Sequence, residues 1–450
     1  MFNNVQTNLK NTIYSPASPI QKSGIIVIRI SGPDMQKVLH SLGCTALTPR
    51  EATLQSIYHP NTKELIDKCI SIYYKSPRSF TGEDVLELHI HGGKAVLDLT
   101  MDALSKIQNL RVADPGEFSM RAFLNNKMDL TEVEGLQDLI DSDTKAQHKQ
   151  ALKKLSGELS LIYENWRKSL LHILTRVEAS IDFPDEEIPA DVLKNTDLKI
   201  KEIIDGINLY LENSKKGEKL SEGLYIAILG PTNAGKSSLI NKISKKDLAI
   251  VSSIEGTTRD IIEIDLDIAG YPVTIADTAG LRESENEIEN EGIRRSIEKA
   301  KTADLKIIML DGSKDFIKEE SIKLAGENDL IVVNKQDLIT AELPLKLGNN
   351  KVLPISIKEN KGIDLLMSEI TNFTKDFFAN TDNTPIITKQ RHRENLSKAL
   401  ECLQNTDLDA DIVLASEELR SAANYLASIT GRIDVESLLG EIFSSFCIGK

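Results

Sequence analysis

The stretch Leu224-Tyr-Ile-Ala-Ile-Leu-Gly-Pro-Thr-Asn-Ala-Gly-Lys-Ser237 decides the fold of the central part of the chain. Its first six residues form an apolar run typical of a buried β-strand, and apolar residues recur at helical spacing directly after it, over 239–243. Between the two, Gly230 and Gly235 let backbone N–H groups turn inward at the positive end of the helix. The pattern predicts a strand, a P-loop and a helix.

The end of this loop carries chemistry. Lys236 is expected to reach the β- and γ-phosphates of a nucleotide, and the hydroxyl of Ser237 to bind Mg²⁺. The alternative is a glycine turn with a purely structural role. The strand before the loop and the helix after it argue against that alternative.

Short apolar runs continue on the C-terminal side of the loop at the spacing of βαβ units. This alternation predicts a mostly parallel sheet with helices on both faces. Residues 262–268 alternate apolar and acidic side chains, which favours an exposed edge hairpin closing at Ala269-Gly270. The expected parallel strands lie at 224–229, 273–276, 304–310, 329–333 and 351–356.

Two short motifs follow expected strands and indicate the nucleotide. Asp277-Thr-Ala-Gly280 can hold a Mg²⁺ water and sense the γ-phosphate, and Asn334-Lys-Gln-Asp337 places a carboxylate where guanine offers two N–H donors. Open α/β sheets bind ligands at the carboxyl ends of their strands, so the motifs reinforce each other. We expect the nucleotide to be GTP. The residue directly after Asp277-Thr-Ala-Gly280 is Leu281, which cannot orient water as the glutamine at this position of Ras-type GTPases does.

The flanking regions differ from this centre. Strands expected at 24–30, 70–74 and 85–90, with a helix at 94–106, indicate an α+β region. An apolar stripe from Leu152 to Ile181 predicts one long helix, and residues 419–429 predict another that ends at Gly431. A further helix is expected to begin at Asp434. The expected domains are 1–118 (N-terminal), 119–215 (helical, first part), 216–378 (inserted G domain) and 379–450 (helical, second part).

Composition narrows the class of protein. Among 450 residues, 54 Lys and Arg face 68 Asp and Glu, a net charge of −14, which excludes coating nucleic acid through the chain's own net field. Four cysteines without CxxC spacing make a disulfide framework or a zinc site improbable. No apolar run is long enough to span a bilayer, and residues 1–15 lack a signal-peptide core. We expect a cytoplasmic protein.

Several blocks together resemble one family, the MnmE (TrmE) tRNA-modification GTPases. They comprise 79–88 (SFTGEDVLEL), 115–119 (PGEFS), 121–127 (RAFLNNK), 181–187 (IDFPDEE), 256–260 (GTTRD), 277–282 (DTAGLR) and 446–450 (FCIGK). The resemblance implies a multidomain fold: an α+β N-terminal folate-binding-like domain, an all-α helical domain, and an inserted α/β P-loop GTPase domain.

For the G domain, the resemblance implies K⁺-activated GTP hydrolysis by G domains that dimerise across their nucleotides. K⁺ would be held by Asn233 and by backbone carbonyls of Ser252, Ile254 and Thr257, and Mg²⁺ by Ser237 and Thr258. Glu289 would orient water and act with Asn233 and Lys236 in catalysis, although its acidic surroundings also fit a solvated face. The expected GTP-binding residues are Asn233, Ala234, Gly235, Lys236, Ser237, Ser238, Ser252, Ser253, Ile254, Glu255, Gly256, Thr257, Thr258, Asp277, Thr278, Ala279, Gly280, Asn334, Lys335, Asp337, Ser356 and Lys358.

For the N-terminal domain, the resemblance implies a site for 5-formyl- or 5,10-methylene-tetrahydrofolate, formed by Arg29, Glu87, Lys127 and the C-terminal Lys450. Taken singly, the first three also fit an edge-strand charge, a solvent-facing strand residue and a helix-terminus cation. Cys447 could be a nucleophile or a buried thiol. His89 and His91 share a strand face, and with no third ligand evident a structural or pterin-adjacent role is favoured over a metal.

The family reaction defines the expected function. The chain would act as a homodimer with an FAD-dependent, MnmG-type partner that also uses NADH. Together they would add a carboxymethylaminomethyl or aminomethyl group, from glycine or ammonium, at C5 of the wobble uridine (position 34) of certain tRNAs. GTP hydrolysis is expected to drive rearrangement of the helical domains and not the base chemistry itself. The alternative is a ribosome-assembly or signalling switch of the Era or Der kind.

Overall fold

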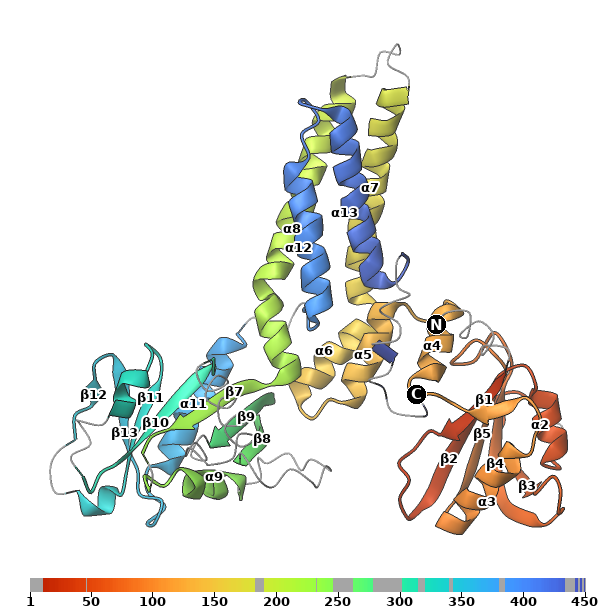
Figure 1. Ribbon diagram of the computed structural model, residues 1–450, viewed down its shortest axis with the longest axis horizontal. Coiled ribbons are helices and arrows are strands. Elements are labelled where there is room, and N and C mark those ends of the chain that lie inside the picture. The colour runs from red at the N-terminus through yellow and green to blue at the C-terminus, as the bar shows by residue number, and fades with distance from the viewer. Residues whose placement is uncertain are drawn as a thin grey trace, which may run out of the picture. The chain divides into compact units, whose positions relative to one another are not determined.

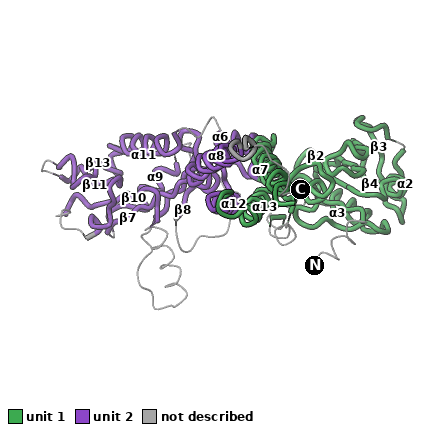
Figure 2. The backbone as a smooth tube through the Cα atoms, turned by 90° about the horizontal axis from the view of Figure 1, so that it is seen from above, with its two compact units in different colours: residues 1–137, 154–187, 406–450 green, residues 138–153, 188–405 purple. Residues whose placement is uncertain are grey.

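Two compact units make up the chain in this computed structural model (Figures 1 and 2). Unit 1 comprises residues 1–137, 154–187 and 406–450, and unit 2 comprises 138–153 and 188–405. They cut across the four predicted domains, whose boundaries stay predictions. The structure describes residues 11–45, 47–182, 190–231, 233–245, 262–277, 302–314, 320–339, 343–379, 385–433, 442–443, 446 and 449.

Unit 1 contains a six-stranded mixed sheet in the order β3-β4-β5-β2-β1-β6. Its strands are β1 (Thr12–Pro16), β2 (Ser23–Ser31), β3 (Thr53–Tyr58), β4 (Leu65–Tyr74), β5 (Val85–Gly92) and β6 (Leu110–Val112). Alternate residues such as Ile26, Ile28 and Ile30 point to a core shared with helices α2 (Met35–Ser41) and α3 (Lys94–Ser105). The α+β prediction is confirmed, and β4 begins five residues earlier than predicted.

A buried ion network connects helix α4 (Glu117–Leu124) to strand β2 of this sheet through Glu83, which accepts from the Ser31 hydroxyl. The fully buried guanidinium of Arg121 contacts Glu117 at 2.9 Å and Glu83 at 3.1 Å, and Arg111 contacts Glu117 at 2.6 Å. Burial would raise the pKa of Glu117, but hydrogen bonds from Arg111 and the Asp114 N–H, with Arg121 nearby, hold it below its usual value of 4.5. The blocks around 79–88, 115–119 and 121–127 therefore meet in one network.

The remaining helices of unit 1 include α7 (Glu158–Asp182) and α13 (Ile412–Thr430), which pack against each other. Asp411 caps α13 by accepting hydrogen bonds from the Val413 and Leu414 N–H groups. Gly431 ends the helix with a φ of +83°, as predicted. The helix expected to begin at Asp434 lies outside the described residues.

The prediction of one long helix from Leu152 to Ile181 is wrong. Helix α6 (Lys145–Leu155) ends before Gly157, whose φ of +78° breaks the helical path, and α7 begins at Glu158. Leu152 is 43% exposed, so the first residue of the apparent stripe is not part of a buried face. The spacing of apolar residues continues across Gly157, so it could not reveal that the backbone there is left-handed and the helix is broken.

Unit 2 contains a seven-stranded sheet in the order β12-β13-β11-β10-β7-β9-β8. All pairs are parallel except the hairpin β8–β9 and the pair β12–β13, so the mostly parallel sheet and the edge hairpin are confirmed. The strands are β7 (Leu224–Leu229), β8 (Ile262–Ile268), β9 (Tyr271–Asp277), β10 (Leu305–Asp311), β11 (Leu330–Asn334), β12 (Lys346–Leu347) and β13 (Asn350–Pro354).

Helices α9 (Lys236–Ser244) and α11 (Ile363–Phe377) share one apolar core with this sheet. Among the described residues, apolar side chains of the short helix η2 (Glu320–Leu324) pack against the opposite face. Helices α8 (Ala190–Glu222) and α12 (Gln390–Asn405) pack together, with an ion pair of 2.8 Å between Glu218 and Arg393. No described helix has both the length and the apolar character needed to cross a membrane.

Replacing Arg121 by Met should lower the free energy of unfolding by about 3–5 kcal/mol, because buried Glu117 would lose one of its two charged partners and Glu83 would lose its ion pair with Arg121. The stabilisation from Glu117 is present above the unfolded pKa of 4.5 and is lost as the pH falls through the lowered folded pKa. Urea denaturation would measure both effects. The control, Arg420→Met, removes a solvent-exposed guanidinium and should leave the midpoint near that of the wild type. An unchanged midpoint in Arg121→Met would contradict this account of the network.

Candidate functional site

The P-loop connects β7 to α9 and requires glycine at two positions. Gly230 has a φ of +140°, and a Cβ there would lie 2.0 Å from the Met309 carbonyl oxygen. Gly235 has a φ of +104°, and a Cβ there would lie 2.5 Å from Asn334 Nδ2. The loop can therefore wrap closely against the neighbouring strands only without these side chains.

Lys236 and Ser237 begin α9 and face the loop. The buried amine of Lys236 donates to the Gly230 and Pro231 carbonyl oxygens at 2.7 and 2.8 Å. Burial lowers the pKa of Lys236, and the nearby Asp277 carboxylate partly offsets this effect. The Ser237 hydroxyl donates to Asp277 at the end of β9. A hydroxyl and a carboxylate in contact are the hard oxygen donors that Mg²⁺ prefers.

Asn334 joins the P-loop to the loop that follows β13. Its side-chain amide donates to the Ala234 carbonyl oxygen at 2.8 Å, and its side-chain oxygen accepts from the Ile357 N–H at 3.2 Å. One side chain thus connects the loops that follow β7, β11 and β13.

Asp337 is the carboxylate that the sequence predicts to accept hydrogen bonds from guanine. The buried Ser356 hydroxyl donates to it at 2.6 Å, and this bond, with Lys358 and Lys361 nearby, holds the pKa of Asp337 below its usual value. Asp337 is therefore ionised at neutral pH and able to accept two guanine N–H donors.

Sequence reasoning missed Asp311. This carboxylate ends β10, and its Oδ2 lies 2.6 Å from the Lys335 amine, while Oδ1 accepts from the Ser313 hydroxyl. Burial would raise the pKa of Asp311, but the hydrogen bonds from Lys335 and Ser313 hold it low. Lys335 itself has a φ of +64°. The signal available was an aspartate directly after the strand predicted at 304–310, at the same sheet edge as the other site motifs.

The structure thus gathers the described site residues at the carboxyl ends of β7, β9, β11 and β13. Ser238 and Lys358 are exposed at this edge. The roles assigned to these residues stay predictions. Outside the described residues lie Ser252, Ser253, Ile254, Glu255, Gly256, Thr257, Thr258, Thr278, Ala279, Gly280, Leu281, Glu289, Cys447 and Lys450.

A second cluster of predicted site residues lies on the N-terminal sheet. Arg29 and Glu87 are register partners on β2 and β5, and Arg29 Nε donates to Glu87 Oε1 at 3.0 Å. The Arg29 guanidinium also lies over the rings of Phe80 and Phe118, at 5.4 and 5.9 Å. The two charges predicted to bind one ligand are therefore in direct contact.

Lys127 follows α4 and lies beside the loop that contains Phe80. A Cβ built on Gly82 would lie 3.3 Å from Lys127 Cγ, and Asn125 donates to the Thr81 carbonyl oxygen at 2.7 Å. The lysine side chain is exposed. The cation therefore stands at the rim of the loop that packs against Arg29.

The two histidines of β5 have separate partners. His91 contacts Asp67 at 2.8 Å, and His89 Nε2 lies 3.9 Å from Glu87 Oε2. Within the part of the chain that the structure describes, no group of three or more His, Cys, Asp or Glu side chains could hold a metal ion.

A mostly parallel α/β sheet with a P-loop, a strand-terminal aspartate facing its serine and an Asn-Lys-Gln-Asp turn defines a P-loop GTPase. Two family models match the chain, the MnmE helical domain over residues 130–447 and the GTP-binding protein TrmE N-terminus over residues 12–127. The chain belongs to the MnmE family.

Curated relatives are similar to this chain in sequence over nearly its whole length. The tRNA modification GTPase MnmE of Rickettsia rickettsii is 49% identical, and that of Rickettsia akari 47%, each over 98% of this chain and 100% of the relative. Among solved structures, the G domain of the T. maritima FeoB iron transporter is 20% identical and covers 34% of this chain and 98% of that chain. Its TM-score of 0.26 is too low to establish a shared fold by itself.

Replacing Asp311 by Asn should raise the Kd for GDP and the KM for GTP about tenfold, the loss of roughly 1.4 kcal/mol, because Lys335 would lose its ion pair. The value of kcat should stay within about twofold, since the pair lies on the base side of the site. Steady-state hydrolysis and equilibrium binding of GDP would measure these constants. The matched control, Asp265→Asn on exposed β8, keeps an acceptor for Thr274 and should match the wild type. Unchanged affinity in Asp311→Asn would refute the role assigned to the pair.

Proposed function

We propose that this GTPase modifies tRNA together with a flavin-dependent partner of the MnmG type. The product is a carboxymethylaminomethyl or aminomethyl group at C5 of the wobble uridine. The observation that carries the proposal is the presence, in one chain, of a guanine-nucleotide site and a separate Arg29–Glu87 cluster. Relatives matched over their full length are named tRNA modification GTPases. That family membership favours modification over the Era- or Der-like switch.

The proposal for GTP hydrolysis begins from Leu281, which cannot orient water. K⁺, held by Asn233 and by backbone carbonyls of Ser252, Ile254 and Thr257, would supply positive charge between the phosphates. The position of Asn233 supports this assignment. It is an exposed residue of the P-loop with a φ of +68°, so its side chain is accessible to a cation at the loop. Ser237 and Thr258 would hold Mg²⁺, and Glu289 would orient the attacking water.

The proposal for the carbon donor rests on the N-terminal cluster. Glu87 accepts from Arg29 and, at 3.5 Å, from the Tyr74 hydroxyl, so its carboxylate is positioned at one end of a small set of donors and acceptors. A pterin offers amine donors to such a carboxylate, and Lys127 and Lys450 suit a glutamate tail or a formyl oxygen. A tetrahydrofolate derivative would therefore bind here and supply one carbon.

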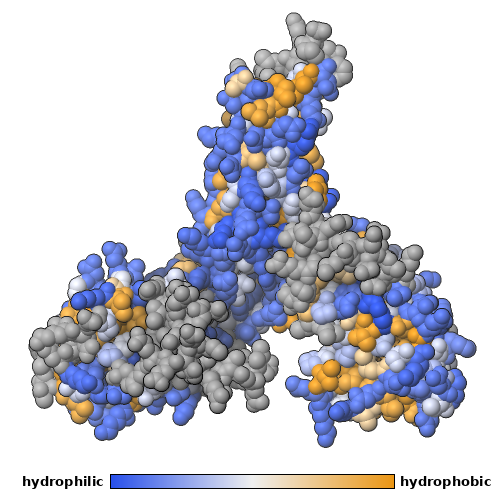
Figure 3. All heavy atoms as spheres, in the orientation of Figure 1, coloured by the Kyte–Doolittle hydropathy of each residue, from blue (hydrophilic) through white to orange (hydrophobic). Residues whose placement is uncertain are grey.

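The proposed assembly is a homodimer that binds the flavoprotein, which carries FAD and NADH. Hydrophobic side chains gather over the N-terminal sheet on the face shown in Figure 3. Leu54 and Ile70, register partners on β3 and β4, are 71% and 41% exposed. Such an apolar surface supports burial between subunits. The net charge of −14 supports a division of labour in which the partner supplies much of the cationic tRNA surface.

Hydrolysis of GTP should be at least tenfold faster in K⁺ than in Na⁺ at equal ionic strength, because only the larger cation suits the predicted carbonyl cage. The measurement is phosphate release by the full chain with saturating Mg²⁺ and GTP. Asn233→Ala should lose the K⁺ acceleration and retain GDP binding. Asn241→Ala, at an exposed position of the helix α9 that follows the P-loop, is the control, and it should keep the acceleration. Equal rates in the two cations would refute the cation site.

A further inference from the structure

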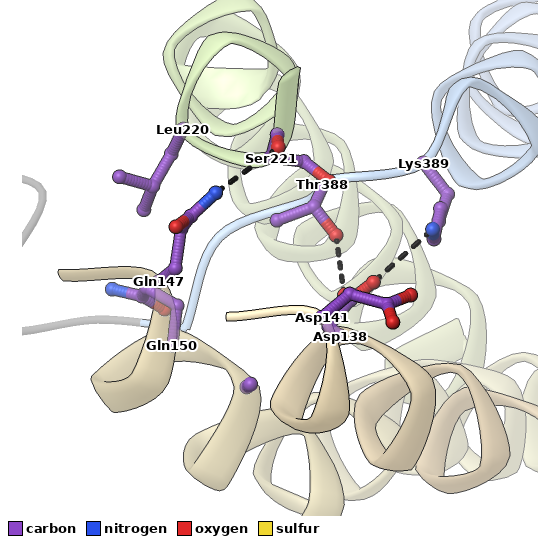
Figure 4. A pocket seen from close by; sticks show the side chains of 9 residues that line it. Asp138, Asp141, Gln147, Gln150, Leu220, Ser221, Thr388 and Lys389 are labelled. Carbon is purple, nitrogen blue, oxygen red and sulfur yellow. Dashed lines mark hydrogen bonds and ion pairs between the residues drawn. The ribbon is translucent and has the colours of Figure 1, made fainter. Parts of the chain in front are cut away.

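Helix α6 lies where three distant segments of unit 2 meet. These segments are the last turn of α8, which leads into β7; residues 385–389, which lead into α12; and the turn of the β8–β9 hairpin. Both chain connections between the α/β sheet and the helices α8 and α12 therefore contact one short helix or the residues before it. Figure 4 shows the small cavity of about 190 Å³ that the two connections share with α6.

Gln147 holds the first connection. Its side-chain oxygen accepts from the Asp143 and Thr144 N–H groups at 3.1 Å and so closes the start of α6. Its side-chain amide donates to the Ser221 carbonyl oxygen at 3.2 Å, as the dashed line in Figure 4 marks. The Gln147 side-chain oxygen thus caps the start of α6, while its amide nitrogen binds the last turn of α8.

Gln150 and Asp138 hold the second connection. The Ile386 N–H donates to Gln150 Oε1 at 3.3 Å. Thr388 donates to Asp138 at 3.3 Å, and the Lys389 amine lies 3.1 Å from the same carboxylate (Figure 4). We call Asp138, Gln147 and Gln150 the clasp.

The same helix is bonded to the hairpin that leads to the nucleotide site. The Ala146 N–H lies in the first turn of α6, where a helix offers no acceptor of its own, and it donates to the Gly270 carbonyl oxygen at 3.0 Å. From Gly270, strand β9 runs to Asp277, which contacts Ser237 of the P-loop. Tyr271 stacks on Phe378 with ring centroids 4.7 Å apart, in a core that also includes Leu220 and Ile386. The hairpin, α6 and both connections are thus packed as one body.

We propose that the clasp residues are positioning residues that couple the nucleotide state of the G domain to the helices. A change at Asp277 would displace the hairpin along β9, and its turn would displace α6 through Ala146. Because Gln147 and Gln150 bind one connection each to α6, and Asp138 on the preceding helix α5 (Leu130–Ile140) binds the second, the two connections would move together and reorient α8 and α12 as a pair. The coupling itself requires only the GTPase; its consequence for tRNA rests on the proposed function.

Hydrogen exchange of the full chain tests the coupling, with GDP compared with a non-hydrolysable GTP analogue. In the wild type, exchange of the amides in 385–392 should change at least threefold between the two nucleotides. Gln147→Glu keeps the oxygen that closes α6 but has no N–H for Ser221. This variant should bind GDP within twofold of the wild type and keep the nucleotide-dependent change in β8 and β9, yet lose most of the change in 385–392.

A second variant and a control make the test decisive. Asp138→Asn keeps an acceptor for Thr388, removes the charge facing Lys389, and should give the same loss. Gln404→Glu makes the same chemical change as Gln147→Glu on the exposed face of α12 and should behave as the wild type. If Gln147→Glu does not fold, Asp138→Asn decides alone. A wild type without nucleotide-dependent exchange in 385–392, or clasp variants that retain it, would overturn the proposal.

In assays of both activities, the clasp variants should keep GTP turnover within twofold while tRNA modification falls at least tenfold. Parallel loss of the two activities would overturn the coupling role, because it would indicate damage to the GTPase itself. A wild type that shows the exchange change but modifies no tRNA would overturn the proposed function and leave the clasp supported.

Discussion

The geometry of the nucleotide site depends on the two hydrogen bonds made by the side chain of Asn334. Its amide donates to the Ala234 carbonyl oxygen in the P-loop, and its oxygen accepts from the Ile357 N–H, next to Ser356, which donates to Asp337. Such a doubly bonded, buried amide costs free energy if either partner is lost, so it keeps the two halves of the site in register. Lys335 and Asp311 extend the same arrangement toward β10. The site is preorganised by groups that need not touch the nucleotide.

In the N-terminal part of the chain, a buried network of charged side chains around Arg121 holds strands and loops in place, as the Asn334 amide does at the nucleotide site. Arg121 and Glu117 are both almost fully buried. Glu83 links them to β2, because it accepts a hydrogen bond from Ser31, two residues after Arg29 on that strand. A buried ion pair needs its remaining hydrogen-bonding groups satisfied if it is to be stabilising. All three guanidinium nitrogens of Arg121 donate hydrogen bonds, whereas Arg111 Nε is buried without an acceptor. The network supports the strand and loop on which Arg29 and Phe80 lie. Conformational coupling between helices and the G domain is carried by neutral side chains and one ion pair in the clasp.

Much of the fold and of the candidate site could be predicted from local sequence pattern. Buried parallel strands such as β7 are continuous apolar runs, and the motifs around Lys236 and Asp337 require specific residues at fixed spacing. The break at Gly157 escaped because apolar periodicity does not report backbone conformation. Asp311 and Gln147 escaped for another reason: their partners lie 24 and 74 residues away, and nothing local marks such a pairing.

The proposed function requires that this chain use GTP to help place a folate-derived carbon on the wobble uridine. The most direct measurement is mass spectrometry of tRNA incubated with the chain, an MnmG-type flavoprotein, GTP, K⁺, glycine, NADH and methylene-tetrahydrofolate carrying a carbon-13 label. We expect labelled carboxymethylaminomethyluridine, and we expect its formation to require all of these components. Unmodified uridine, or a modified base without the label, would contradict it.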